Sequence, residues 1–454
     1  YPGWIIALSR YPVAEGAPFD RPSTRGIFRR ARLVALAGTA LLTAPAEAGG
    51  LFVGEFGQPV QGASRAGSHA LAEDASTAAT NPAGVALLER RMSMVTGITI
   101  LSEVEFKQKE TFPSTPTAVA NADGSGAASD GGDAGSTAVG GAFSHASPMN
   151  DKWGWGLAVA SISGAELGYE NASDFAGRYW ATNVELLTIN FMPSLSYKMT
   201  EDLSVAVTLP LTVGVLDMDV TIPGLAPGIP EGRAQITDSD DTTLGFGVSA
   251  LWQASDTLRL GLVYQNKTEM DFDGDLEITL PQGVTGDAVA SNVEFTYPQT
   301  LRASAAKELG SRLTLLASVA WEDWSQFGEI LISTPAGAGG LPRNWEDTWF
   351  YSAGLRWQQN ARWVFYTGVS YDTDPTQASD RTSDMPIDEQ WRFSGGLTYK
   401  RSNGHRFGAV VTYADYGDAA IANGGNRPVT GEPWTVNGDH RTNQIVFLGV
   451  NYSF

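Results

Sequence analysis

Hydrophobic and polar residues alternate along many segments of this chain. From Leu203 to Val215 every odd position holds leucine or valine, and the even positions hold mostly small or polar residues. The segment from Trp391 to Tyr399 alternates in a similar way. Because successive side chains of a β-strand point to opposite faces of the sheet, each segment predicts a strand with one apolar and one polar face. A soluble antiparallel sandwich has the same pattern, so alternation alone leaves two architectures open.

The lengths of these segments favour a membrane barrel. We expect fourteen strands, most of them with eleven residues or more. Strands of soluble proteins average about five to six residues, whereas a tilted membrane strand needs about nine to eleven. The predicted strands are 92–106, 137–147, 153–163, 185–198, 203–216, 243–253, 257–271, 293–307, 312–324, 345–358, 362–373, 390–400, 405–416 and 441–454.

The connections between the predicted strands alternate between short turns and long loops. An even strand count with this alternation is typical of outer-membrane barrels. Closure is required in lipid, because every backbone N–H and C=O group must find a partner within the protein. The predicted fold class is therefore all-β, a 14-stranded antiparallel transmembrane β-barrel with apolar side chains facing lipid and polar side chains facing the lumen.

The two ends of the chain carry signals for export and assembly. Basic residues precede an apolar run from Leu33 to Thr43, and the small-x-small sequence Ala46-Glu47-Ala48 follows. We expect residues 1–48 to be an upstream extension plus a signal peptide that is cleaved after Ala48. The last predicted strand alternates up to Phe454, an ending that resembles the signal read by the barrel assembly machinery. These features predict a protein of the Gram-negative outer membrane.

Residues 49–91 differ from the rest of the chain. They are rich in alanine, glycine and serine and lack clean alternation, and Asn81-Pro82-Ala83-Gly84 predicts a break in local structure. So small a segment cannot bury a core alone. We expect it to be a hatch, or plug, that docks in the lumen, and residues 92–454 to form the barrel with long extracellular loops.

Composition and motifs exclude several other functions. The net charge of −20 disfavours nucleic acid as a partner, and the absence of cysteine is compatible with an oxidising compartment. The four histidines have no metal-ligand spacing. Asp271, Asp273 and Asp275 resemble part of a calcium loop that lacks its final glutamate, although acidic loops could still bind Ca²⁺ or bridge lipopolysaccharide. We expect no cofactor, no dedicated metal site and no enzyme activity.

Several segments resemble the FadL-type family of outer-membrane transporters. They are the hatch sequence from Ala70 to Ser76, Asn81-Pro82-Ala83-Gly84, Phe191 to Lys198, Leu280-Pro281-Gln282, Trp321 to Ser325, Trp345 to Trp349, and Asp380-Arg381-Thr382 with Pro386. The resemblance implies a hatch-plugged, monomeric barrel that takes up hydrophobic molecules such as long-chain fatty acids or hydrocarbons. It also implies passive diffusion, with a lateral exit through the wall into the lipids.

The resemblance also implies roles for particular residues. The candidate site residues are Gly49, Leu51 and Phe52 as the hatch end that touches ligand; Asn81, Pro82 and Ala83 as the hatch turn and gate; Gly154, Gly156 and Gly164 in the strand beside the lateral opening; and Ile222, Leu225, Ile229, Leu276 and Ile278 in capture-groove loops 217–242 and 272–292. Each set also has a purely structural interpretation, as a turn, as glycines packed under neighbours, or as loop-on-loop packing.

The nature of the cargo stays open at this point. Arg65 and Arg233 look isolated in sequence. Six arginines predicted to face the lumen could bind a fatty-acid carboxylate or balance lumenal acids: Arg259, Arg302, Arg312, Arg356, Arg392 and Arg406. Neutral hydrocarbons are therefore plausible cargo. The alternative functions are a phospholipase-like barrel enzyme and an adhesive or structural barrel.

Overall fold

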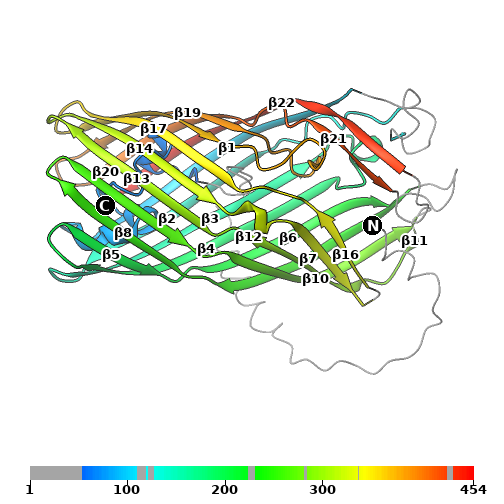
Figure 1. Cartoon of the computed structure of the whole chain (residues 1–454), viewed down its shortest axis with the longest axis horizontal. Helices are drawn as coiled ribbons and strands as arrows, with labels where there is room; N and C mark the ends of the chain where they lie inside the picture. Colours follow the sequence, from blue (N-terminus) through cyan, green and yellow to red (C-terminus); the bar gives the residue numbers. More distant parts are fainter. Residues whose placement is uncertain are drawn as a thin grey trace, which may run out of the picture.

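The computed structural model describes residues 54–109, 119–120, 127–222, 231–280, 284–335, 337–426 and 433–454. They form a closed antiparallel barrel whose strands run obliquely along its length (Figure 1). Closure occurs where the first strand, β1 (Met92–Gln108), pairs with the last strand, β22 (Pro433–Ser453). No helix among the described residues has the length and apolar character needed to cross a membrane.

The wall contains fourteen continuous strands, several of which are divided into two segments by short breaks. The predicted fold class is confirmed. Besides β1 and β22, the segments are β2 (Thr137–Pro148), β3 (Trp153–Gly168), β4 (Asn183–Lys198), β5 (Leu203–Thr208), β6 (Leu211–Ile222), β7 (Gly232–Leu244), β8 (Gly247–Ser255), β9 (Leu258–Gln265), β10 (Thr268–Leu280), β11 (Val284–Thr285), β12 (Val289–Tyr297), β13 (Thr300–Leu309), β14 (Leu313–Glu322), β15 (Glu329–Thr334), β16 (Gly337–Pro342), β17 (Thr348–Gln358), β18 (Trp363–Asp372), β19 (Gln390–Lys400), β20 (Arg406–Asp415) and β21 (Ile421–Asn426).

Proline explains two of the breaks. Pro210 separates β5 from β6, and Pro298 separates β12 from β13. Proline has no N–H to give to the ladder, so it interrupts regular pairing. Neighbouring strands still bond across the first break, where the Gly245 N–H donates to the Pro210 carbonyl at 2.8 Å. The wall therefore remains continuous at this point.

Four predicted loops are shorter in the structure, and the prediction was wrong there. Segments 217–242 and 272–292 consist largely of the extended ends of β6, β7, β10 and β12. Likewise, β15 and β16 occupy part of the predicted loop 325–344, and β21 with the start of β22 occupies part of 417–440. Alternation stops where the outer face carries polar residues, yet backbone pairing continues beyond that point. The sequence pattern therefore hides these strand ends.

The two faces of the wall differ as predicted. Val207, Leu355 and Val411 point outward and are 52%, 38% and 45% exposed, whereas Ser204 and Thr212 point inward and are buried. Large apolar side chains on an outer surface favour a lipid environment. Residues 54–91 contact other parts of this inner face, as where the Ser64 and Ser394 hydroxyls bond at 2.8 Å.

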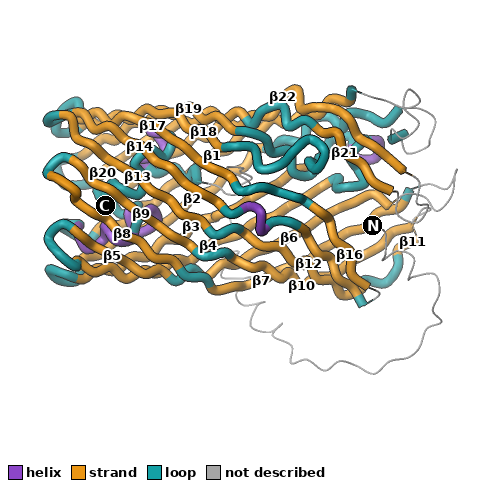
Figure 2. The backbone as a smooth tube through the Cα atoms, viewed as in Figure 1, coloured by secondary structure: helices purple, strands orange, loops and turns teal. Residues whose placement is uncertain are grey.

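The hatch residues 54–91 lie inside the barrel near the end that carries the C terminus (Figure 2). Their short helices are η2 (Pro59–Ala63), α2 (Thr77–Thr80) and η3 (Pro82–Leu87); further turns in the connections are η4 (Ala172–Asp174) and η5 (Trp324–Gln326). Buried Ala63 packs close to the wall, where a Cβ on Gly368 would lie 2.2 Å from its carbonyl oxygen. Glycine in the wall thus permits direct contact with the hatch backbone.

Candidate functional site

Asn81 connects the hatch to the wall. Its fully buried side chain donates from Nδ2 to the carbonyl of His69 at 2.7 Å and to the carbonyl of Ala250 on β8 at 2.9 Å. Its Oδ1 accepts the Ala83 N–H at 3.1 Å and caps η3, which begins with Pro82. These three residues therefore form a rigid turn that is attached to the barrel. Whether this turn acts as a gate stays a prediction.

Charged and polar contacts attach the middle of the hatch. Glu73 pairs with Arg356 on β17 at 3.1 Å, and its carbonyl accepts a bond from Arg406 on β20 at 2.8 Å. The Nδ1 atom of His69 lies 2.7 Å from the Thr80 carbonyl. Desolvation lowers the pKa of His69 to about 3, so its imidazole is neutral at ordinary pH. The neutral imidazole then donates its Nδ1–H to the Thr80 carbonyl.

A cluster of buried charges lies where the N-terminal part of the hatch meets the wall. Arg392 on β19 pairs with Asp372 and lies 3.5 Å from hatch residue Glu55. Arg302 pairs with Glu322 at 2.9 Å. Such burial requires pairing, because an uncompensated charge in this environment is costly. These arginines balance lumenal acids, one of the two roles predicted for them.

Arg65 and Arg233, which look isolated in the sequence, have partners in the structure. The Arg65 guanidinium lies 4.7 Å from the centre of the Phe350 ring, close to the charge cluster. Arg233 pairs with Asp219 at 2.6 Å. Both partners are distant in sequence or on a neighbouring strand, so local charge patterns did not reveal them. Arg312 is not in the lumenal cluster, since it lies in the exposed turn before β14.

An apolar cluster fills the barrel at the end opposite the short turns. It includes Trp324 and Phe327 around η5, Trp345, and Phe272 and Phe295 from β10 and β12. The rings of Trp324 and Trp345 have centres 5.1 Å apart in an edge-on arrangement. Aromatic pairs of this kind add to the free energy of apolar burial. The cluster lies next to the buried charges, since Trp324 Nε1 donates to Glu322 at 3.0 Å.

Three predicted capture-groove residues belong to this cluster and not to exposed loops. Leu276 on β10 is 3% exposed and lies within it, while Ile222 and Ile278 are partly buried against it. The loop placement was wrong because β6 and β10 continue past their alternating parts. Leu225, Ile229 and the hatch residues Gly49, Leu51 and Phe52 lie outside the described residues.

Sequence reasoning missed the aromatic residues of this cluster as site candidates. Trp324 and Trp345 appeared only as parts of family-like segments, and Phe327 was not singled out. The sequence signal that could have identified them is a tryptophan within a polar stretch that follows a strand. Such large rings are usually buried against other residues.

The wall contains one interruption next to β3. Pairing between β2 and β3 ends at Phe143 and Val159, and the rest of β3 pairs only with β4. The two sides meet again where the Gly168 N–H donates to the Ala134 carbonyl at 3.4 Å. The β3–β4 register also shifts between Ser161 and Ser163, which marks a bulge. We call this stretch, in which β2 and β3 form no ladder with each other, the wall window.

The predicted glycines divide between two positions. Gly164 lies within the wall window. Gly154 and Gly156 lie in the fully paired part of β3, so they do not form the break. Cβ atoms at these two positions would lie 3.0 Å from the Ala86 nitrogen and 2.9 Å from the Ala78 Cβ, respectively. They leave room for the hatch.

The acidic residues of β10 bear on the Ca²⁺ hypothesis. Asp271 and Asp273 are exposed and share the Asn292 amide, which lies 3.1 Å from the Asp273 carboxylate. Among the described residues, no group of three or more acidic, histidine or cysteine side chains could hold a metal ion. The Ca²⁺ hypothesis therefore has no support from this arrangement.

Comparison with known proteins gives the family. The family model described as "Outer membrane protein transport protein (OMPP1/FadL/TodX)" matches residues 39–454. The chain belongs to this family. The match covers the hatch, the barrel and the wall window, so this family member is an outer-membrane protein, and its short turns face the periplasm.

Curated relatives agree over most of their length. The long-chain fatty acid transport protein of Escherichia coli O6:H1 (strain CFT073) is 23% identical over 394 residues, which cover 79% of this chain and 85% of the relative. Outer membrane protein P1 of Haemophilus influenzae is 24% identical over 406 residues, which cover 80% of this chain and 86% of the relative.

Solved structures show the same fold. A Pseudomonas aeruginosa FadL homologue superposes with a TM-score of 0.80 at 19% identity, and the match covers 89% of this chain and 99% of the homologue. The toluene transporter TodX of P. putida superposes with a TM-score of 0.61 at 15% identity, with coverage of 84% and 93%. At these identities the likeness supports the barrel architecture.

Proposed function

We propose that this protein lets hydrophobic molecules diffuse across the outer membrane, from the apolar cluster near the loops to the wall window and from there into the membrane. The observation that carries the proposal is the wall window itself. A membrane barrel normally pairs every strand with both neighbours, so a stretch where two adjacent strands form no ladder is kept only if it has a use. Its position beside β3 gives the lumen a side exit.

The hatch supports a lateral route over a straight one. Asn81 and Glu73 attach it to β8, β17 and β20, so it blocks the direct path to the periplasm. A hydrophobic molecule that leaves sideways avoids crossing water. Partly buried residues at the edge of the apolar cluster, such as Ile222 and Ile278, bind it through apolar contact, which is weak enough to allow release. Diffusion down a gradient needs no energy source.

Named relatives limit the class of cargo. One is a long-chain fatty acid transport protein, and another matching structure is a toluene transporter. We infer that this member carries long-chain fatty acids or related hydrocarbons. We also infer that it is not an enzyme, as the family description names transport alone. Phospholipid hydrolysis by the purified barrel, abolished by one serine substitution, would overturn that second inference.

Further partners follow from its position in the outer membrane. We infer that the barrel is a monomer that contacts lipopolysaccharide and that Phe454 is read by the assembly machinery. The Phe454 backbone pairs with Ser93 on β1, while its ring is 49% exposed. Removal of Phe454 should reduce the amount of assembled barrel in the membrane; an unchanged amount would contradict this role.

A bulky group in the wall window tests the proposed route. Cysteine at Gly140, on the β2 edge of the window, can be modified with a large maleimide because the chain has no other cysteine. Uptake of labelled oleate or of a labelled alkane into cells that lack other family members should then fall sharply. The control is Gly395→Cys on β19, where the strand is paired on both sides and a Cβ meets no atom within 4 Å. Equal uptake by both modified variants would reject the window as the exit.

A further inference from the structure

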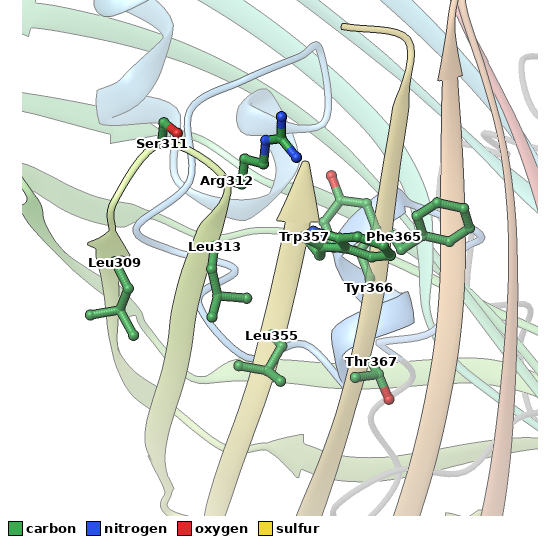
Figure 3. A pocket seen from close by; sticks show the side chains of 9 residues that line it. All are labelled: Leu309, Ser311, Arg312, Leu313, Leu355, Trp357, Phe365, Tyr366 and Thr367. Atoms are coloured by element: carbon green, nitrogen blue, oxygen red, sulfur yellow. The ribbon is translucent and has the colours of Figure 1, made fainter. Parts of the chain in front are cut away.

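A hollow of about 670 Å³ lies on the outer face of the barrel near its periplasmic end (Figure 3). It extends from the β13–β14 hairpin across β17 to β18. Its lining consists of Leu309, Ser311, Arg312, Leu313, Leu355, Trp357, Phe365, Tyr366 and Thr367. Leu309, Leu355 and Trp357 are each more than a third exposed, so the hollow opens toward lipid and not toward the lumen.

Strand register explains why the hollow forms. Leu313, Trp357 and Phe365 lie opposite one another on adjacent strands and make a row of large side chains. In the next row, Leu355 lies opposite Thr367, and Thr367 lies opposite Gly395. Small residues in this second row leave a depression beneath the aromatic rings, whose centres are 5.7 Å apart.

Arg312 gives the hollow a charged upper edge. It lies in the exposed turn before β14. The Arg312 carbonyl accepts the Gln358 N–H at 2.8 Å, so the turn is held next to β17. Figure 3 shows its guanidinium above the leucines, beside the end of β17. A second exposed arginine, Arg362, lies in the neighbouring turn before β18. The two exposed turns therefore place two cations at this end of the wall.

We propose that this hollow binds one anionic phospholipid of the periplasmic leaflet, with its phosphate at Arg312 and an acyl chain along Leu313, Leu355 and Trp357. Guanidinium groups pair well with phosphate, and apolar side chains below them suit hydrocarbon. Lipopolysaccharide is excluded as the occupant because it lies in the opposite leaflet. Strands intervene on both sides between this hollow and the wall window, so the lipid site is independent of the proposed transport route.

The test compares phospholipid retention by matched variants. The barrel is purified from nanodiscs of phosphatidylglycerol and phosphatidylethanolamine, and native mass spectrometry counts the retained lipids. Wild type should keep one phosphatidylglycerol. Arg312→Gln should lower its occupancy about fivefold, as expected for one basic residue at a membrane surface. Arg401→Gln, an exposed arginine in the β19–β20 turn, should have no effect.

A second variant tests the apolar part of the site without changing charge. Thr367→Phe fills the hollow, whereas Val411→Phe adds the same ring on the outer face of β20. Only the first should lower retention, and both should stay folded because they place apolar groups in lipid. Retention unchanged in both Arg312→Gln and Thr367→Phe overturns the proposal. Photolabelling gives a second check. If a photoreactive oleate labels the strands that line the hollow and a photoreactive phosphatidylglycerol does not, the proposal is also overturned.

Discussion

Single buried side chains attach the hatch to the barrel. Asn81 satisfies two carbonyls and one N–H at once. The carboxylates of Glu55 and Glu73 lie next to wall arginines. Without them, these arginines would be buried with fewer opposite charges nearby. Both kinds of contact join residues that are remote in sequence, so each is a point where one substitution should loosen the plug.

Asn81→Ala should release the turn of the hatch. The Ala250 and His69 carbonyls would lose their donor, at about 1–3 kcal/mol for each buried group left without a partner. We expect hydrogen exchange of residues 77–88 to accelerate at least about tenfold, which corresponds to about 1.4 kcal/mol. Asn403→Ala, which removes a bond to His405 in an exposed turn, serves as the control. Equal protection in both variants would contradict the tethering role of Asn81.

His69 should make the hatch sensitive to acid. Its folded pKa is about 3, below the unfolded value of 6.5, so the unfolded hatch binds the proton first. Neutral His69 is compatible with the folded hatch, so the hatch has its full stability above pH 6.5. Its stability decreases as pH falls from 6.5 toward 3, because protonation of His69 favours the unfolded hatch. The mobility of a spin label at Ala79 should rise over this range more in wild type than in His69→Gln, which stays uncharged. Identical pH profiles would show that His69 does not set the response.

At the scale of elements, β3 has two different halves. Its periplasmic half pairs with β2 and β4 and lies against the hatch at Gly154 and Gly156. Its outer half pairs with β4 alone and borders the wall window. The bulge between Ser161 and Ser163 separates these halves, consistent with the way bulges bend a strand and end its pairing.

Gly156→Ala should displace the hatch from β3. The new Cβ would lie 2.9 Å from the Ala78 Cβ and 2.7 Å from the Ser194 Oγ, closer than normal contact. Overpacking of this kind costs about 1–3 kcal/mol, so we expect faster proteolysis of the hatch. Gly395→Ala, with no neighbour within 4 Å, provides the matched control. Similar proteolysis of the two variants would show that contact at Gly156 does not hold the hatch.

At the scale of the whole molecule, the barrel and the hatch make unequal contributions. The barrel closes through β1 and β22 without the hatch, so its backbone pairing does not require residues 54–91. The hatch instead fills the lumen and compensates wall charges such as Arg356 and Arg392. We therefore expect folding of the wall and closure of the channel to be separable.

Deletion of residues 49–91 should leave a folded but leaky barrel. Backbone pairing persists, whereas Arg356 and Arg392 lose acidic partners, so some stability should be lost as well. In planar bilayers, we expect ion conductance well above that of the intact protein, and on gels a heat-modifiable folded band. Conductance equal to wild type would mean that the hatch does not close the lumen.

The sequence by itself determined the barrel, because period-two alternation is a local property that each strand carries. It also revealed the hatch turn at Asn81, since Asn-Pro breaks regular structure. Tertiary structure alone decided where the wall window opens, how far β6 and β10 extend, which ring Arg65 contacts and which acids pair with Arg392. These features depend on which strands adjoin after closure and on charges brought together from distant segments. No local pattern of side chains encodes such neighbours.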